Sequence, residues 1–191
     1  MSPHDTPTTD ANTAAARAER WREAVHESAH LVVGHVVYGR GGRAQLWRDG
    51  TAETRPDCED WQRSLFGGAI ILAAAWAAER LDATEGLFGP MPEEPPEDLP
   101  PCPTPAPPPG SADEPRLKLF GVLDASVNPG VRQYWEDAAR RAATDFIRAN
   151  AGGIAFLANR LFVYGHVQID GDGRFVWETA GPAGTPPATP G

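Results

Sequence analysis

Two histidines and a glutamate near the N-terminus have the residue types and spacing of metal chemistry. They lie in the run His26-Glu27-Ser28-Ala29-His30, an HExxH motif. On an α-helix, residues four apart differ by ~40° in direction and ~6 Å in rise, so both imidazoles can bind one Zn²⁺ from the same face. Glu27 points ~100° away, where it can take a proton from metal-activated water and deliver it to a leaving amine. The motif therefore predicts a zinc hydrolase with His26 and His30 as ligands and Glu27 as the catalytic residue.

The sequence around the motif predicts a helix with a buried side, from about Ala14 to Tyr38. Polar groups in such a helix are costly to bury unless they have partners, and a metal ion supplies one. The competing interpretation, two surface histidines and a solvated glutamate, fits these apolar surroundings less well. The apolar residues that recur at helical spacing are Trp21, Val25, Ala29, Val32 and Val36.

A third zinc ligand has to come from another part of the chain. Three protein ligands with an open fourth position are typical of a catalytic zinc site. His35 lies nine residues after His26, which is ~900° of rotation, so it faces the opposite side and is expected to be a polar residue at the helix end. His166 is expected in a loop, and His4 in the N-terminal tail. An acidic ligand is the natural choice, and periodicity leaves five candidates open: Glu79, Asp113, Glu114, Asp124 and Asp137.

The remaining patterns predict a mainly α fold with a small β element. Asp-Gly turns indicate two hairpins, one around Asp49-Gly50 and one around residues 170–173. The strand at 44–47 is expected to offer an edge to an extended substrate. The six tryptophans are expected to be core and packing residues rather than a platform on which a ligand stacks. Further helices are expected at 58–81, at 128–150 with a break at Gly152-Gly153, at 154–161, and briefly after Ser111 or Asp113.

Composition divides the chain into one domain with two tails and an insertion. The 191 residues suffice for one hydrophobic core, which we place at 13–179, with disordered tails at 1–12 and 180–191. Residues 89–110 hold 11 prolines and four acidic residues but no basic one. Such a segment cannot build a core. It is interpreted as a surface insertion, with a proline-rich docking segment as the alternative.

Charge and cysteine content exclude several classes of function. The net charge is −9 and no basic cluster is present, which argues against nucleic acid and anionic lipid as partners. No apolar stretch is long enough to span a membrane. Cys58 and Cys102 lack the spacing of a disulfide framework or a cysteine zinc site. With no secretory signal at the N-terminus, these features predict a cytoplasmic protein.

The motif and its surroundings resemble a known family. Residues 24–33 are similar to the zinc helix of the FtsH-type peptidase domain, the protease half of the membrane-anchored AAA proteases. Residues 72–81 end in Ala-Ala-Glu-Arg-Leu and resemble that family's next helix, which ends in Ala-Ala-Glu-Glu-Leu. Residues 150–161 are similar to the closing helices. The likeness covers roughly residues 18–165, with the proline-rich segment as an insertion.

The resemblance also implies a third ligand. In the family this ligand is an aspartate in a Gly-Ala-Ser-Asn-Asp type of sequence that opens a helix. Residues 110–113 read Gly-Ser-Ala-Asp and keep the glycine and a serine two before the aspartate. The resemblance therefore implies Asp113 as the ligand, while Glu114 and Asp124 remain open.

The function implied is that of a stand-alone zinc metalloendopeptidase with an HExxH zincin-like helical domain. Its cofactor would be Zn²⁺ and its substrate a peptide or an unfolded protein. Unlike the family, the chain has no GxxxxGK[ST] loop, so it would act without ATP, and a separate ATPase or adaptor stays an open partner. The alternatives are a catalytically inactive zinc-binding regulatory or interaction module of the same fold, and a zinc hydrolase of non-peptide amides.

Overall fold

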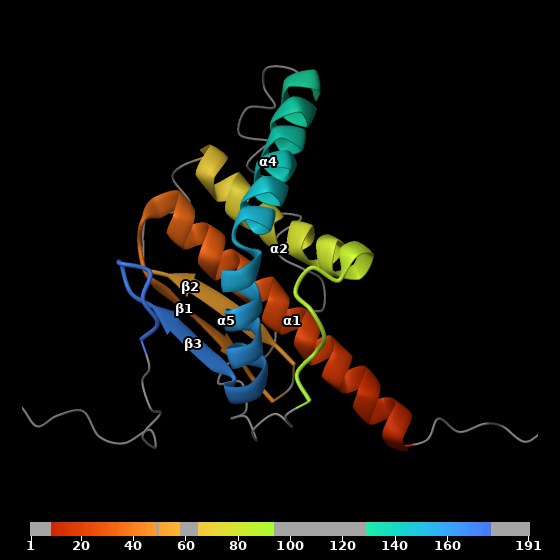
Figure 1. Ribbon diagram of the computed structural model, residues 1–191. Coiled ribbons are helices and arrows are strands. Elements are labelled where there is room, and N and C mark those ends of the chain that lie inside the picture. Colours follow the sequence, from red (N-terminus) through yellow and green to blue (C-terminus); the bar gives the residue numbers. More distant parts are fainter. Residues whose placement is uncertain (1–8, 49, 58–64, 94–128, 177–191) are drawn as a thin grey trace, which may run out of the picture.

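A computed structural model of the chain describes residues 9–48, 50–57, 65–93 and 129–176. In these ranges it shows a mainly helical fold with a small antiparallel sheet, which confirms the predicted class (Figure 1). The elements in chain order are α1 (Thr9–Tyr38), β1 (Gly42–Leu46), β2 (Ala52–Pro56), α2 (Leu65–Glu85), α4 (Pro129–Ala149), α5 (Ala151–Tyr164) and β3 (His166–Ile169).

Helix α1 is the central element, with α2, α5 and the sheet all packed against it (Figure 1). It ends at Tyr38 as expected, and Gly39 follows with φ 61°. It begins at Thr9, however, so residues 9–12, expected in the N-terminal tail, belong to the helix. Its contribution to the core consists of Trp21, Ala24, Val25, Ala29, Leu31 and Val33.

The sheet has the order β2-β1-β3, and both pairings are antiparallel. Ala44 in the middle of β1 pairs with Thr54 on one side and Val167 on the other. Both predicted hairpins are confirmed, because β1 and β2 are neighbours and Ile169 bridges to Phe175 beyond β3. The expectation that residues 44–47 offer a free edge is wrong, since β1 is hydrogen-bonded on both sides and the outer strand next to it is β2.

Helix α2 is apolar on nearly every side, as its sequence predicts. From Gly67 to Ala78 every residue is buried except Trp76. The many alanines among them let neighbouring backbones approach closely. The helix ends at Glu85, four residues beyond the expected end, while residues 58–64 of the predicted helix lie outside the described ranges.

The break between α4 and α5 lies at Asn150, so the prediction of a break at Gly152-Gly153 is wrong. The N–H of Asn150 donates to the carbonyls of Phe146 and Ile147 and completes the last turn of α4. The carbonyl of Asn150 then accepts the N–H of Ile154 and begins α5. The two glycines fall in the first turn of α5, where a helix has no intrahelical acceptors for its N–H groups.

The tryptophans do not share one environment. Trp21 is buried in the core and meets Phe162 edge-on, as expected. Trp76 and Trp135 are 38% and 44% exposed, so the expectation of core positions is wrong for these two. The ring of Trp76 is covered in part by the guanidinium groups of Arg80 and Arg140, which lie 5.3 and 4.5 Å from its centre.

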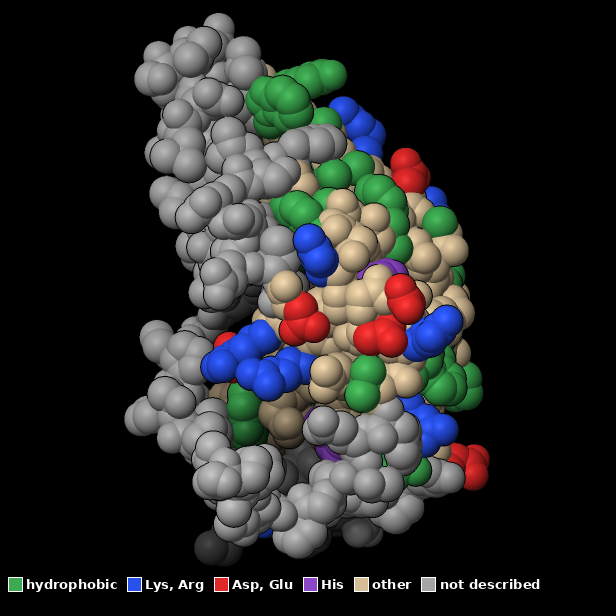
Figure 2. Space-filling model, turned by 90° about the vertical axis from the view of Figure 1, so that its left-hand side faces the viewer, with side chains coloured by type: hydrophobic (Ala, Val, Ile, Leu, Met, Phe, Trp, Pro, Cys, Tyr) green, Lys and Arg blue, Asp and Glu red, His purple; other side chains and the backbone are tan. Residues whose placement is uncertain are grey.

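Several expectations fall on residues outside the described ranges. They concern most of the proline-rich segment, the short helix after residue 111, both cysteines and the outer parts of the two tails. Among the helices that are described, none is long and apolar enough to cross a membrane. Acidic and basic side chains are interspersed on the face shown in Figure 2.

Candidate metal and catalytic site

His26 and His30 lie side by side on one face of α1. Their ring centroids are 4.9 Å apart, and the rings stand at 78° to each other. His30 is 9% exposed, and His26 is partly buried. The structure therefore confirms that the motif is helical and that both imidazoles share a half-buried face.

Helix α2 orients both rings through their Nδ1 atoms. Nδ1 of His30 lies 2.8 Å from the carbonyl oxygen of Ile71, and Nδ1 of His26 lies 2.5 Å from Oε1 of Glu79. A carbonyl only accepts hydrogen bonds, as does an ionised carboxylate, so Nδ1 is the donor in each ring. Zinc-binding histidines usually have such an acceptor on the other ring nitrogen, which sets the tautomer and the ring orientation.

The two acceptors are available because α2 crosses α1 in the opposite direction. Ile71 accepts the hydrogen bond of His30, and Glu79 accepts that of His26. Residue numbers therefore rise along α2 in the direction in which they fall along α1. Gly34, one turn beyond His30, lies so close to α2 that a Cβ there would be 3.8 Å from Cδ1 of Ile71. Glu79 was one of the open candidates for the third ligand, and in this structure its carboxylate accepts the hydrogen bond from Nδ1 of His26.

Glu27 is held beside the histidines by the sheet. Glu27 is 7% exposed. Its backbone carbonyl accepts a hydrogen bond from Oγ1 of Thr54 at 2.9 Å. This bond attaches β2 to α1 at the candidate catalytic residue. Sequence reasoning did not identify Thr54, because its relation to Glu27 arises only from the packing of the hairpin on the helix.

A second carboxyl group, Glu23, precedes Glu27 by one turn and was also missed. Burial raises the pKa of Glu23, while the neighbouring His26 and a hydrogen bond from Arg22 act to lower it. Glu23 is thus a half-buried acid whose charge interacts with both His26 and Glu27. The spacing could have predicted this role, because Glu23 lies three residues before His26 and four before Glu27, and such residues are neighbours on a helix.

The described residues contain no third side chain placed beside His26 and His30 as a metal ligand. In residues 9–48, 50–57, 65–93 and 129–176, no group of three His, Cys, Asp or Glu side chains is placed to hold a metal ion. Asp137 lies on α4, where its carboxylate accepts a hydrogen bond from Gln133 at 3.0 Å. The other candidates, Asp113, Glu114 and Asp124, lie outside those ranges. Within those ranges, His26 and His30 offer two nitrogen donors, fewer than the three protein ligands typical of a catalytic zinc site.

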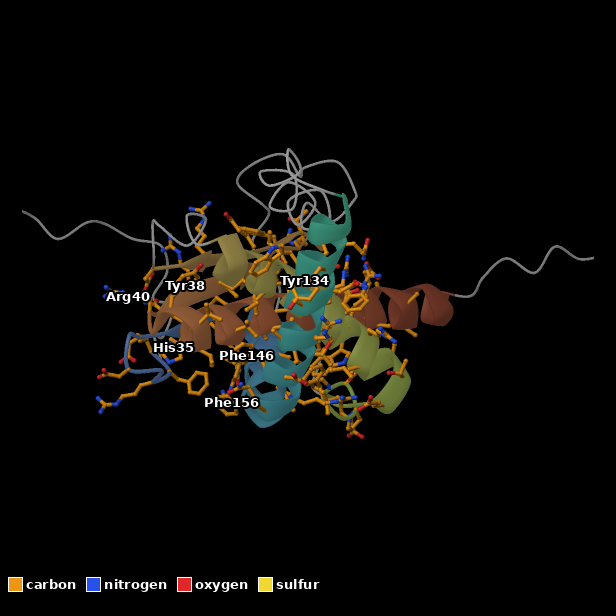
Figure 3. The ribbon with its side chains drawn as sticks, turned by 90° about the horizontal axis from the view of Figure 1, so that it is seen from above. His35, Tyr38, Arg40, Tyr134, Phe146 and Phe156 are labelled. Atoms are coloured by element: carbon orange, nitrogen blue, oxygen red, sulfur yellow. The ribbon has the colours of Figure 1, made fainter. Side chains whose placement is uncertain are left out.

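The other histidines are placed elsewhere. His35 lies at the end of α1 and donates from Nδ1 to the carbonyl of Arg40 at 2.8 Å, as expected of a polar residue at a helix end (Figure 3). His166 is the first residue of β3, so the expectation of a loop is wrong. His4 lies outside the described residues.

No known protein family, curated protein or solved structure matches the chain. A function can therefore be inferred only from the motif and from the geometry around it.

Proposed function

We propose that the protein is a zinc-dependent metallopeptidase that hydrolyses bonds in peptides or unfolded proteins without ATP. The observation that carries the proposal is the orientation of both motif histidines by acceptors on α2. A pair of unrelated surface histidines would not need matching acceptors from a second helix. With Nδ1 as the donor to α2, metal binding through Nε2 is compatible with the orientation of both rings.

Each residue of the motif has a separate role in this proposal. His26 and His30 hold the ion, and Asp113 completes the ligand set, as the family resemblance implies. A bound Zn²⁺ supplies Lewis acidity, which polarises the scissile carbonyl and lowers the pKa of a water molecule toward ~7. Glu27 accepts the proton of the attacking water and returns it to the leaving amine.

The outer edge of β2 supports an extended polypeptide as the substrate. Backbone bonds join Trp47 to Thr51 and Asp57 to Gly41, both at 2.9 Å. Hydrogen-bonded pairs alternate along an antiparallel ladder, so Ala52 and Thr54 direct their N–H and C=O groups away from β1. An added strand could pair with these groups, and Thr54 also contacts Glu27. Only an unfolded segment can lie along such an edge.

Replacement of Glu27 by Gln tests the proposal, because it preserves size and removes the base. We expect Glu27→Gln to keep its zinc and to lose about 10²-fold or more of its activity on an unfolded protein substrate. The matched control is Glu19→Gln, the same change on an exposed part of the same helix, which should keep full activity. Full activity in Glu27→Gln would show that the proposed mechanism is wrong.

The main alternative remains a zinc-binding regulatory module of the same fold that has no turnover. Intact Glu27 argues against it, since a purely structural site does not need a buried base beside the ligands. A wild-type chain that binds zinc and cleaves no peptide or protein would favour this alternative. A zinc hydrolase of non-peptide amides would use the same ligands. Activity assays on peptide and on non-peptide amide substrates would distinguish it from a peptidase.

A further inference from the structure

Three carboxylates follow one another along α1 up to the candidate catalytic residue. Glu19, Glu23 and Glu27 are four residues apart, so they form one row on the helix, and like charges at this spacing repel. Arg22 pairs with both Glu19 and Glu23, so one positive charge is shared between two negative ones. The row therefore carries an excess of negative charge beside His26.

Glu23 keeps an unused acceptor in this row. Its side chain is 23% exposed, and its Oε1 accepts a hydrogen bond from Arg22 at 3.2 Å. Its Oε2 accepts none from any residue that the structure describes. Arg22 is itself 52% exposed and also bound to Glu19. A partly buried carboxylate with one unused oxygen is suited to a further charged donor.

Glu27 adds an unpaired charge one turn further on. The residue is 7% exposed, and in the described part of the chain nothing donates to its carboxylate or forms an ion pair with it. A buried carboxylate without a partner is unfavourable, and the charges of Glu23 and Glu27 also act on each other. A Zn²⁺ ion held with one carboxylate ligand contributes a single positive charge, so the row stays negative with the metal in place.

The spacing of the two carboxylates matches that of an extended polypeptide. One helical turn separates Glu23 from Glu27 by ~6 Å along the axis, and two residues of an extended chain cover ~6.6 Å. A peptide bond that lies at Glu27 therefore brings the substrate residues one or two positions away close to Glu23. Lysine and arginine carry their charge on long flexible stems, so they reach this carboxylate from the backbone of the substrate.

We propose that Glu23 selects substrates with an arginine or lysine side chain one or two residues from the cleaved bond. The inference rests on the proposed function, since it names the substrate class of the same site. The cationic side chain donates to Oε2 of Glu23 and offsets the excess charge of the row. A neutral side chain of equal length leaves both carboxylates as they are in the free chain.

Matched peptides that contain arginine or citrulline test the proposal, because citrulline keeps the size of arginine and lacks its charge. The residue is placed in turn at each position within two residues of the cleaved bond. We expect the full, zinc-loaded chain to cleave the arginine peptide with a kcat/KM about 10-fold higher at one or more of these positions. Equal kcat/KM values at all of them would overturn the proposal.

Glu23→Gln shows whether this carboxylate causes the preference. The ratio of the two kcat/KM values should fall close to one in Glu23→Gln and stay near 10 in Glu85→Gln, where the carboxylate pairs with Arg148. Zinc content is measured in both variants. A preference that survives Glu23→Gln would overturn the proposal. So would lowered zinc content together with an equal loss for both peptides, because Glu23 would then serve the metal.

Peptide affinity separates a failure of this inference from a failure of the proposed function. Fluorescence anisotropy of labelled peptides measures the charge preference without turnover. If the wild-type chain cleaves neither peptide but binds the arginine peptide about 10-fold more tightly, and Glu23→Gln removes the difference, the metallopeptidase proposal fails and the role of Glu23 stands. Cleavage of both peptides with equal affinity and equal rate would overturn the role of Glu23 and leave the metallopeptidase in place.

Discussion

Two regions of the same helix carry histidines in contrasting surroundings. At the middle of α1, the acceptors of His26 and His30 lie 53 and 41 residues away in the sequence, on α2. At the end of α1, the acceptor of His35 is the carbonyl of Arg40, five residues away. The hydrogen bonds of the first region join two helices, whereas the hydrogen bond of His35 lies within a local turn and its ring packs against Gly173.

The difference separates a candidate binding site from an ordinary helix end. A local carbonyl at a helix terminus satisfies one imidazole and needs no further function. Two imidazoles on one half-buried face, each held by a residue of a second helix, form a preorganised pair.

The largest effect is expected from removal of the histidines themselves. The wild-type chain should bind about one zinc ion, and His26→Ala combined with His30→Ala should bind none. His35→Ala is the matched control and should keep the full zinc content. Metal analysis of the purified proteins measures all three. Wild-type protein that contains no zinc and takes none up on titration would remove the basis of the contrast.

A smaller effect is expected at the third ligand. Asp113→Ala should lower zinc affinity by more than about 100-fold, because a direct ligand has greater weight than its supporting residues. Peptidase activity should fall in parallel. Competition with a chelator measures the affinity. If Glu114→Ala or Asp124→Ala loses zinc while Asp113→Ala binds normally, the motif stands and the assignment of Asp113 is wrong.

The smallest effect is expected from the support of His26. Glu79→Gln should lower zinc affinity by about 10-fold to 100-fold, since a charged acceptor of the ring Nδ1–H is replaced by a neutral one. Glu85→Gln makes the same change at the end of the same helix, where the partner is Arg148, and should leave affinity unchanged. Equal behaviour of the two variants would mean that the contact between Glu79 and His26 does not serve the metal.

Local patterns predicted much of this fold. The end of α1 at Tyr38, the start of α4 at Pro129 and both hairpins follow from glycine, proline and apolar spacing. The patterns failed at the break between the last two helices, because glycine in a first turn interrupts no hydrogen bond. They also failed at Trp76, because the composition of a helix does not reveal where its surface stays uncovered.

The shared face of His26 and His30 follows from local sequence, since the helical repeat places residues four apart together whatever surrounds them. The contacts of Glu79 and Ile71 with those rings, and of Thr54 with Glu27, arise from the packing of separate elements. These contacts join residues 27 to 53 positions apart, and their geometry depends on how α2 and β2 pack against α1. No local pattern specifies such a crossing, because it results from the fit of all the buried side chains together.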